Sequence, residues 1–208
     1  MTAPTSSAKE ESSRRWALDA LARIYSAMDA DYEKAASAHG FVCQGCGDNC
    51  CRTRFYHHTL VEYFYLRKGL RALPDAERSR IETQAAQAVA RMKTVGDEPP
   101  SEATMCPLNA LGRCQLYAYR PMICRLHGIP HQLRRPDGRH QVGPGCGDFD
   151  RQCGAACAPI LDRTTLYAAL AELERELRQR LGFTDKLRMT IAQMLVEKLA
   201  LPDDGGRR

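Results

Sequence analysis

Apolar residues recur every three to four positions near the N-terminus of the chain, which is the spacing of an amphipathic helix. This pattern predicts a helix over residues 14–39, and Gly40 stands where that helix would end. The same spacing predicts a second helix over residues 59–72. Pro74 then indicates a turn into a third helix over residues 75–93.

The last third of the chain returns to helical spacing. Leucines one turn apart predict a helix over residues 162–181 with Gly182 as its stop. Thr184 is the predicted N-cap of a final helix that runs through Leu199. We expect the leucine stripe to face the core rather than a partner.

The centre of the chain lacks this periodicity. Residues 106–154 are rich in Gly, Pro and Cys, and only two short strands are predicted there, over residues 114–117 and 140–142. The predicted fold class is therefore mainly α, with helices flanking an irregular cysteine-rich metal-binding centre.

The 208 residues suffice for one domain with an ordinary apolar core. We expect a disordered N-terminus over residues 1–13 and a cysteine-cluster metal-binding domain with N-terminal helices over residues 14–158. A C-terminal helical pair over residues 159–201 should pack on that domain, and a loose tail should follow over residues 202–208.

No basic stretch followed by an apolar run opens the chain, and no segment approaches the roughly 20 apolar residues of a membrane span. We therefore expect a cytoplasmic protein without membrane contact. The net charge of +5 is modest, and the arginines are not interleaved with aromatic residues, so nucleic acid is not an expected partner. An unidentified protein partner stays open.

The ten cysteines are the main chemical signal. In the reducing cytoplasm, such a density indicates metal binding or catalysis rather than disulfides. The sequence singles out no cysteine beside a base as a nucleophile, and it contains neither a dinucleotide fingerprint nor a phosphate loop. Metal binding is the simpler interpretation.

Four of the cysteines fall within nine residues, at Cys43, Cys46, Cys50 and Cys51. The Cys43-x-x-Cys46 spacing lets two sulfurs reach one metal from a tight turn, as in zinc and iron–sulfur sites. Adjacent side chains of an extended chain point to opposite faces, so Cys50 and Cys51 are expected to serve two metal atoms, or one of them to pack.

The other six cysteines occur singly, at Cys106, Cys114, Cys124, Cys146, Cys153 and Cys157. No second Cys-x-x-Cys pair is present, which argues against a simple zinc ribbon. Cys153 and Cys157 have the spacing of one helical face and are interpreted as structural or accessory. Among the histidines, His127 could form a mixed pair with Cys124, although a polar surface or helix-end position is the preferred interpretation for it and for His57 and His58.

The cysteine blocks resemble the CxxCxxCC family of YkgJ-type cysteine-cluster proteins, which are zinc- or iron-chelating domains. The blocks that carry the resemblance are Cys43-x-x-Cys46-x-x-x-Cys50-Cys51, Cys106-Pro107-Leu108, Gly112-Arg113-Cys114-Gln115-Leu116-Tyr117 and Arg120-Pro121-Met122-Ile123-Cys124-Arg125. The first block has one residue more than the family's name implies, and the last block places Cys146 after Pro-Gly rather than before it.

The resemblance implies a metal site built from eight cysteines: Cys43, Cys46, Cys50, Cys51, Cys106, Cys114, Cys124 and Cys146, with Cys153 as the alternative to the last. It implies iron, as an iron–sulfur cluster with a redox or sensing role, or else zinc in a structural interaction module. Flagellin lysine N-methylases are similar over these blocks, so a metal-assisted protein lysine methyltransferase is a third alternative. We expect Arg120 and Arg125 to lie near the sulfurs and balance their charge.

Overall fold

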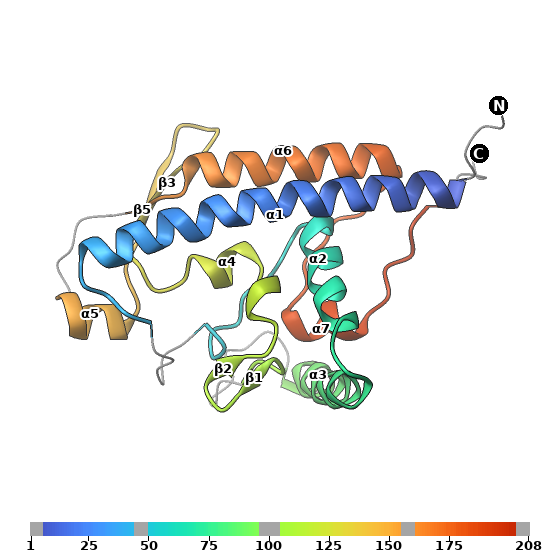
Figure 1. Cartoon of the computed structure of the whole chain (residues 1–208), viewed down its shortest axis with the longest axis horizontal. Helices are drawn as coiled ribbons and strands as arrows, with labels where there is room; N and C mark the ends of the chain where they lie inside the picture. Colours follow the sequence, from blue (N-terminus) through green and yellow to red (C-terminus); the bar gives the residue numbers. More distant parts are fainter. Residues whose placement is uncertain (1–5, 44–49, 96–104, 155–160, 203–208) are drawn as a thin grey trace.

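A computed structural model describes residues 6–43, 50–95, 105–154 and 161–202 of the chain (Figure 1). The described part is mainly helical, as predicted, and its seven α-helices occupy most of its length. Of the segments predicted to be disordered or loose at the two ends, residues 1–5 and 203–208 lie outside these residues. Of the helices described, none combines the length and the apolarity needed to cross a bilayer.

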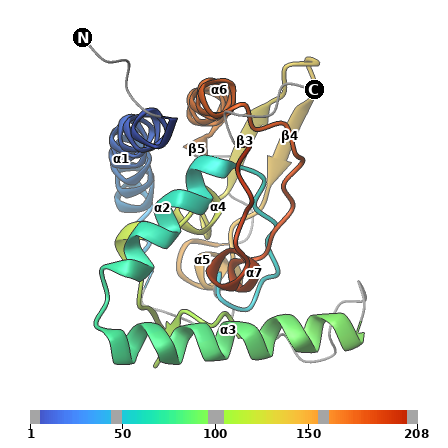
Figure 2. The same cartoon turned by 90° about the vertical axis from the view of Figure 1, so that its right-hand side faces the viewer.

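Two long helices, α1 (Ser6–Ala38) and α6 (Thr164–Leu181), lie side by side along one edge of the molecule (Figures 1 and 2). Their predicted apolar stripes are buried, and fully or almost fully enclosed side chains include Leu21, Met28 and Leu177. The predicted stop of α6 is confirmed, because Gly182 is its left-handed C-cap. Helix α1 ends just before Gly40, also as predicted.

Helix α1 begins eight residues earlier than its predicted start, so the expectation of disorder is wrong for residues 6–13. This first part of the helix has few apolar residues, and periodicity could not detect it. Ion pairs one turn apart stabilise it instead: Glu10 pairs with Arg14, and Glu11 pairs with Arg15 at 3.2 Å.

Helix α2 (Leu60–Arg71) packs against both α1 and α6, and a carboxylate of α6 caps its N-terminus. The buried Glu174 accepts hydrogen bonds from the backbone N–H groups of Leu60 and Val61, at 2.7 and 3.0 Å. These two groups have no partner within their own helix, so the charged acceptor stabilises the helix start. Near the other end of α2, Gly69 lies directly beneath the ring of Tyr119.

Helix α3 (Asp75–Val95) lies at the opposite side of the molecule from α1 and contacts the short helix α7 (Ile191–Val196) (Figure 2). The predicted cap of the last helix is wrong, since the N-cap of α7 is Thr190 rather than Thr184. Thr190 and Gln193 form a reciprocal capping box. The preceding residues are extended, and Met189 pairs with His57 through two backbone hydrogen bonds of 2.7 and 3.0 Å.

A small three-stranded sheet lies beside α6, in the order β4-β3-β5. Strands β3 (His131–Arg134) and β4 (His140–Gly143) are antiparallel, which confirms the strand predicted near residue 140. Strand β5 (Leu161–Asp162) runs parallel to β3. The short helix α5 (Gly147–Cys153) follows β4, and Cys146 is its N-cap.

The strand predicted over residues 114–117 is shorter than expected and pairs in a tight hairpin. Strands β1 (Asn109–Ala110) and β2 (Arg113–Cys114) are joined by Leu111 and Gly112, which both have positive φ, 51° and 82°. The chain then enters the 3-10 helix η1 (Tyr117–Tyr119) instead of continuing as a strand.

Candidate metal centre

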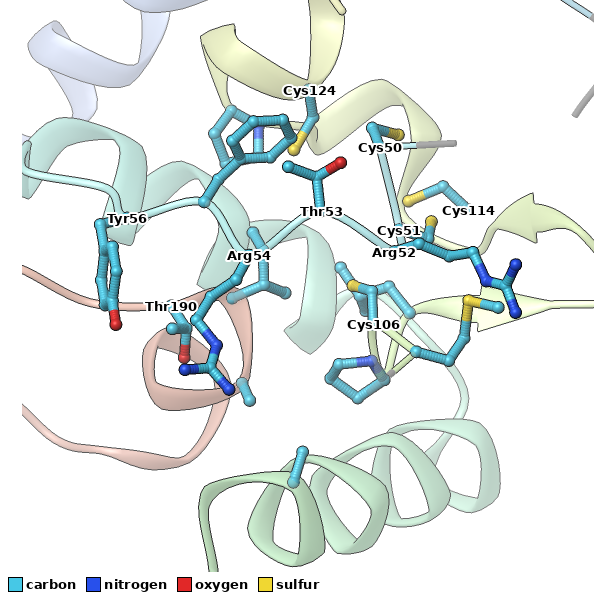
Figure 3. Close-up of a pocket in the computed structure, with 18 of the residues that line it drawn as sticks. Cys50, Cys51, Arg52, Thr53, Arg54, Tyr56, Cys106, Cys114, Cys124 and Thr190 are labelled. Atoms are coloured by element: carbon cyan, nitrogen blue, oxygen red, sulfur yellow. The ribbon is translucent and has the colours of Figure 1, made fainter. Parts of the chain in front are cut away.

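A cavity of about 530 Å³ lies between the segment 50–56, the loop 105–108, the hairpin, the end of α3 and the start of α7 (Figure 3). Five of the predicted ligands line it: Cys50, Cys51, Cys106, Cys114 and Cys124. Figure 3 shows their side chains grouped toward one end of the cavity. Cysteines from four separate stretches of sequence are therefore brought together.

Cys50 and Cys51 lie in a turn rather than in extended chain, which makes the expectation of opposite faces wrong. Both thiols line the same cavity, and they hydrogen-bond to each other. The turn is tied to the next cysteine by backbone, since the N–H of Cys106 donates to the carbonyl of Cys51 at 2.8 Å. The loop that follows Cys106 is closed by a 2.9 Å bond from the N–H of Asn109 to the carbonyl of Cys106.

Cys124 is positioned by the short helix α4 (Met122–Arg125), which is anchored to α2 by a buried carboxylate. Glu62, only 4% exposed, accepts a 2.7 Å hydrogen bond from the backbone N–H of Met122 and a 2.8 Å bond from the hydroxyl of Tyr25. A charged acceptor with several donors is well satisfied in the interior. The scaffold helices thus fix where Cys124 enters the cavity.

Arg125 serves the same anchoring purpose and is not a partner of the thiols. Arg125 is 5% exposed, and its guanidinium pairs with Asp29 of α1 at 2.6 Å. It also donates to the backbone carbonyls of Ala118 and Arg120 and lies 4.1 Å from the ring centre of Tyr25. The prediction that Arg125 balances the charge of the sulfurs is therefore wrong, because the carboxylate of Asp29 already occupies it.

Arg120 does line the cavity, as predicted. Its guanidinium lies 3.5 Å from the ring centre of Tyr117 and donates to the carbonyl of Tyr117 at 3.1 Å and of Cys124 at 3.4 Å. Its positive charge lowers the pKa of the neighbouring thiols, in opposition to larger effects of burial and hydrogen bonding.

Hydrogen bonds among three thiols concentrate negative charge on Cys51. The Cys106 thiol donates to it, the Cys50 thiol donates as well, and together these bonds hold the pKa of Cys51 well below its usual range. The same bonds raise the pKa of Cys50 and of Cys106, because each thiol loses its hydrogen bond to Cys51 when its proton dissociates. One thiolate is thus shared by a cluster of three sulfurs.

The other two thiols of the cavity stay protonated at neutral pH without a metal. Burial raises the pKa of Cys124 to about 12, with a smaller contribution from repulsion by the neighbouring Cys114 when both thiols ionise. Burial also raises the pKa of Cys114. A bound cation would reverse these shifts, because metal coordination deprotonates thiols.

Two of the described ligand candidates, Cys43 and Cys146, do not line the cavity. Cys43 is exposed, and Cys146 caps α5, where its sulfur accepts the N–H of Phe149 at 3.5 Å. Both lie close to Tyr32, whose pKa is raised by burial first and by these two cysteines next. Cys46 lies outside the described residues, as does Cys157.

The remaining candidates are engaged elsewhere. The Cys153 thiol donates to the carbonyl of His39 at 3.2 Å. His127 packs edge-on against Phe55, and the ring of His58 bonds the carbonyl of Leu187 at 2.8 Å. None of these three side chains lines the cavity. Within the described ranges, no three Cys, His, Asp or Glu side chains are arranged as ready ligands of a single metal ion.

The sequence did not predict the residues that line the cavity away from the cysteines. Arg54 and Tyr56 follow the first cysteine cluster, and Arg188 precedes α7; all three line the wall. The Arg-x-Arg pattern directly after Cys51 was the available signal for the first of them.

Comparisons with known proteins add no relative to this description. A scan against protein-family models found no match, and searches of the curated proteins and of the solved structures found none either. The resemblance to the CxxCxxCC family therefore stays a prediction from the cysteine blocks.

Proposed function

We propose that the cysteines of the cavity bind a metal centre, with iron as an iron–sulfur cluster, and that this centre has a redox or sensing role. The observation that supports the proposal is the convergence of five thiols on one cavity wall. They come from a turn, a loop, a hairpin and a short helix that are distant in the sequence.

The donor set is suited to a soft metal. The described lining residues offer thiol sulfurs and no carboxylate, and soft thiolate ligands select zinc, copper(I) and iron–sulfur clusters over hard cations. Tetrahedral structural zinc takes four ligands, whereas five thiols line this cavity. Cys50 and Cys51, adjacent in a turn, present two of these sulfurs to the same cavity.

The surrounding structure supports a functional rather than a purely structural metal. An extensive apolar core encloses side chains of α1, α2, α3, α6 and α7, so folding of the helices does not depend on the thiols. Four of the five thiols are half-buried, Cys51 is buried, and all five line the cavity. A centre in this position can exchange electrons or respond to oxidants while the scaffold stays folded.

Anaerobic purification followed by metal analysis and an electronic spectrum tests the proposal. The expected protein is brown, contains iron and acid-labile sulfide, and absorbs in the visible region. Cys51→Ser and Cys124→Ser should each lose most of the iron. Cys153→Ser is the matched control, because its sulfur bonds the carbonyl of His39 and does not line the cavity.

The possible outcomes separate the alternatives. Colourless protein with stoichiometric zinc that depends on Cys51 and Cys124 would refute iron and support a thiolate zinc site. Protein that binds neither metal, or that binds it equally in all three variants, would refute the proposed centre altogether.

A further inference from the structure

We propose that the end of the cavity away from the thiols binds a small organic anion, a carboxylate or phosphate carried on an apolar body. The inference goes beyond the metal centre and does not require one, because it depends on side chains that the thiols do not use. Its main support is the charge of the cavity wall.

The wall is strongly cationic. Four arginines line the cavity, and no aspartate or glutamate is among its described lining residues: the arginines are Arg52, Arg54, Arg120 and Arg188. A pocket lined by one sign of charge with apolar walls attracts ligands of the opposite sign. Guanidinium groups in particular bind carboxylates and phosphates through paired hydrogen bonds.

Two of these arginines are directed away from the sulfurs. Figure 3 shows Arg54 extending from the segment after the cysteines toward Thr190, at the end of the cavity opposite Cys50 and Cys114. Arg188 comes from the extended segment before α7, and its guanidinium lies 3.7 Å from the ring centre of Tyr56. Arg120, in contrast, is the arginine whose charge acts on the thiols.

Arg54 and Arg188 also keep their hydrogen-bonding capacity. In the part of the chain that the structure describes, neither guanidinium pairs with a carboxylate, whereas the buried Arg125 is held by Asp29. Arg188 is steadied by the face of an aromatic ring, which leaves its N–H groups available. The Thr190 hydroxyl is committed to its capping box, so recognition of an anion falls to the arginines.

Apolar side chains form much of the remaining wall and define the body of the ligand. Helix α3 contributes Ala88 and Met92, the loop after Cys106 contributes Leu108, and α7 contributes Ile191 and Ala192. The volume of about 530 Å³ lies within the range of small-molecule sites, roughly 300–1,000 Å³. A few fixed charges on a mainly apolar surface are the usual features of such sites.

Ligand-observed NMR with matched pairs of probes tests this proposal on the full chain as purified. Octanoate and octan-1-ol share an apolar chain and differ in charge, and phenyl phosphate and phenol form a second pair. The anion of at least one pair should bind roughly 10- to 100-fold more tightly than its neutral partner, as expected for charge-assisted hydrogen bonds. The pair that shows the larger ratio identifies carboxylate or phosphate as the preferred group.

Charge-matched variants localise the binding. Arg54→Gln with Arg188→Gln should reduce the affinity for the anion roughly 10-fold or more and leave the neutral probe unchanged. Arg134→Gln with Arg135→Gln removes the same charge from exposed residues that do not line the cavity, and it should leave both probes unchanged. Circular dichroism checks that each variant is folded.

Equal binding of anion and neutral probe by the wild-type chain would overturn the proposal even if a variant failed to fold. Equal loss in the two double variants would also overturn it, since it would show attraction to net charge rather than to a site. Cys51→Ser separates this proposal from the metal centre: it should lose the metal and retain the anion.

Discussion

The helical scaffold of α1, α2 and α6 differs from the wall of the cysteine cavity in the contacts that hold it. In the scaffold, apolar side chains such as Leu21 and Leu177 are fully enclosed between helices. In the cavity wall, short elements are fixed by buried charges that bond backbone groups, as Glu62 does to Met122 and Arg125 to Ala118. Bulk stability therefore resides in one region, and the exact placement of thiols depends on a few polar contacts in the other.

The largest expected effect is on the scaffold. Leu177→Ala should lower the free energy of unfolding by about 2–5 kcal/mol, because it leaves a cavity in a close-packed interface. Urea denaturation followed by circular dichroism measures it. Leu111→Ala is the control, since that leucine is fully exposed, and it should change the value by less than about 0.5 kcal/mol. A loss below about 1 kcal/mol for Leu177→Ala would contradict the assignment of most of the folding stability to the helical scaffold.

The second prediction concerns the contact that joins the two regions. Glu62→Ala should cost about 2–4 kcal/mol, because it leaves the Tyr25 hydroxyl and the Met122 N–H buried without an acceptor. In metal-free protein, the substitution should also speed alkylation of Cys124, because α4 loses its hydrogen bond to Glu62. Mass spectrometry measures the rate of alkylation. Glu62→Gln keeps an oxygen acceptor and should cost less on both measures. Unchanged Cys124 reactivity in Glu62→Ala would show that α4 is fixed by other contacts.

The third prediction is a pH dependence of stability that arises from two histidines outside the scaffold helices. Burial lowers the pKa of His57 below its ordinary 6.5, and burial also lowers that of His131. The unfolded chain then binds more protons than the folded one below pH 6.5, so stability is full above that pH and declines as pH falls through it. The free energy of unfolding should therefore fall between pH 7 and pH 5, which urea denaturation at the two pH values measures. A His57→Gln variant should show a shallower decline, and an identical slope would contradict the assignment.

The smallest effect is expected in the hairpin of the cavity wall. Leu111 has a φ of 51°, in the left-handed region that disfavours residues with a Cβ. Leu111→Gly should therefore raise the free energy of unfolding by about 0.5–1 kcal/mol. Ala110→Gly, in the adjacent strand, should lower it instead. Calorimetric melting of both variants checks the opposite signs.

Sequence periodicity predicted the scaffold well because burial in a helix repeats every turn. It missed the start of α1, where ion pairs such as Glu10–Arg14 replace apolar contacts. It also misjudged the chain before α7, where Leu187 and Met189 are buried in alternation. An alternation of two apolar residues is too short to distinguish from a helical pattern, and the strand pairing with His57 that settles it is distant in the sequence.

The sequence predicted that the cavity would carry thiols, but not which residues line it. Cysteine spacing indicated soft ligands, and five of the seven predicted cysteines that the structure describes line one cavity. Which five depends on bonds between distant segments, such as that from the N–H of Cys106 to the carbonyl of Cys51, and no local spacing encodes them. The same limit explains Arg125, whose partner Asp29 is far away in the chain.

The contact of Gly69 with Tyr119 gives this fold one position where two common rules of protein engineering disagree. Replacing a glycine inside a helix by alanine usually gains roughly 0.5–1 kcal/mol. Here the added methyl would come within 2.4 Å of the tyrosine ring and would push η1 outward. Because η1 leads directly into Arg120 and α4, a substitution chosen to strengthen α2 would displace the segment that carries Cys124.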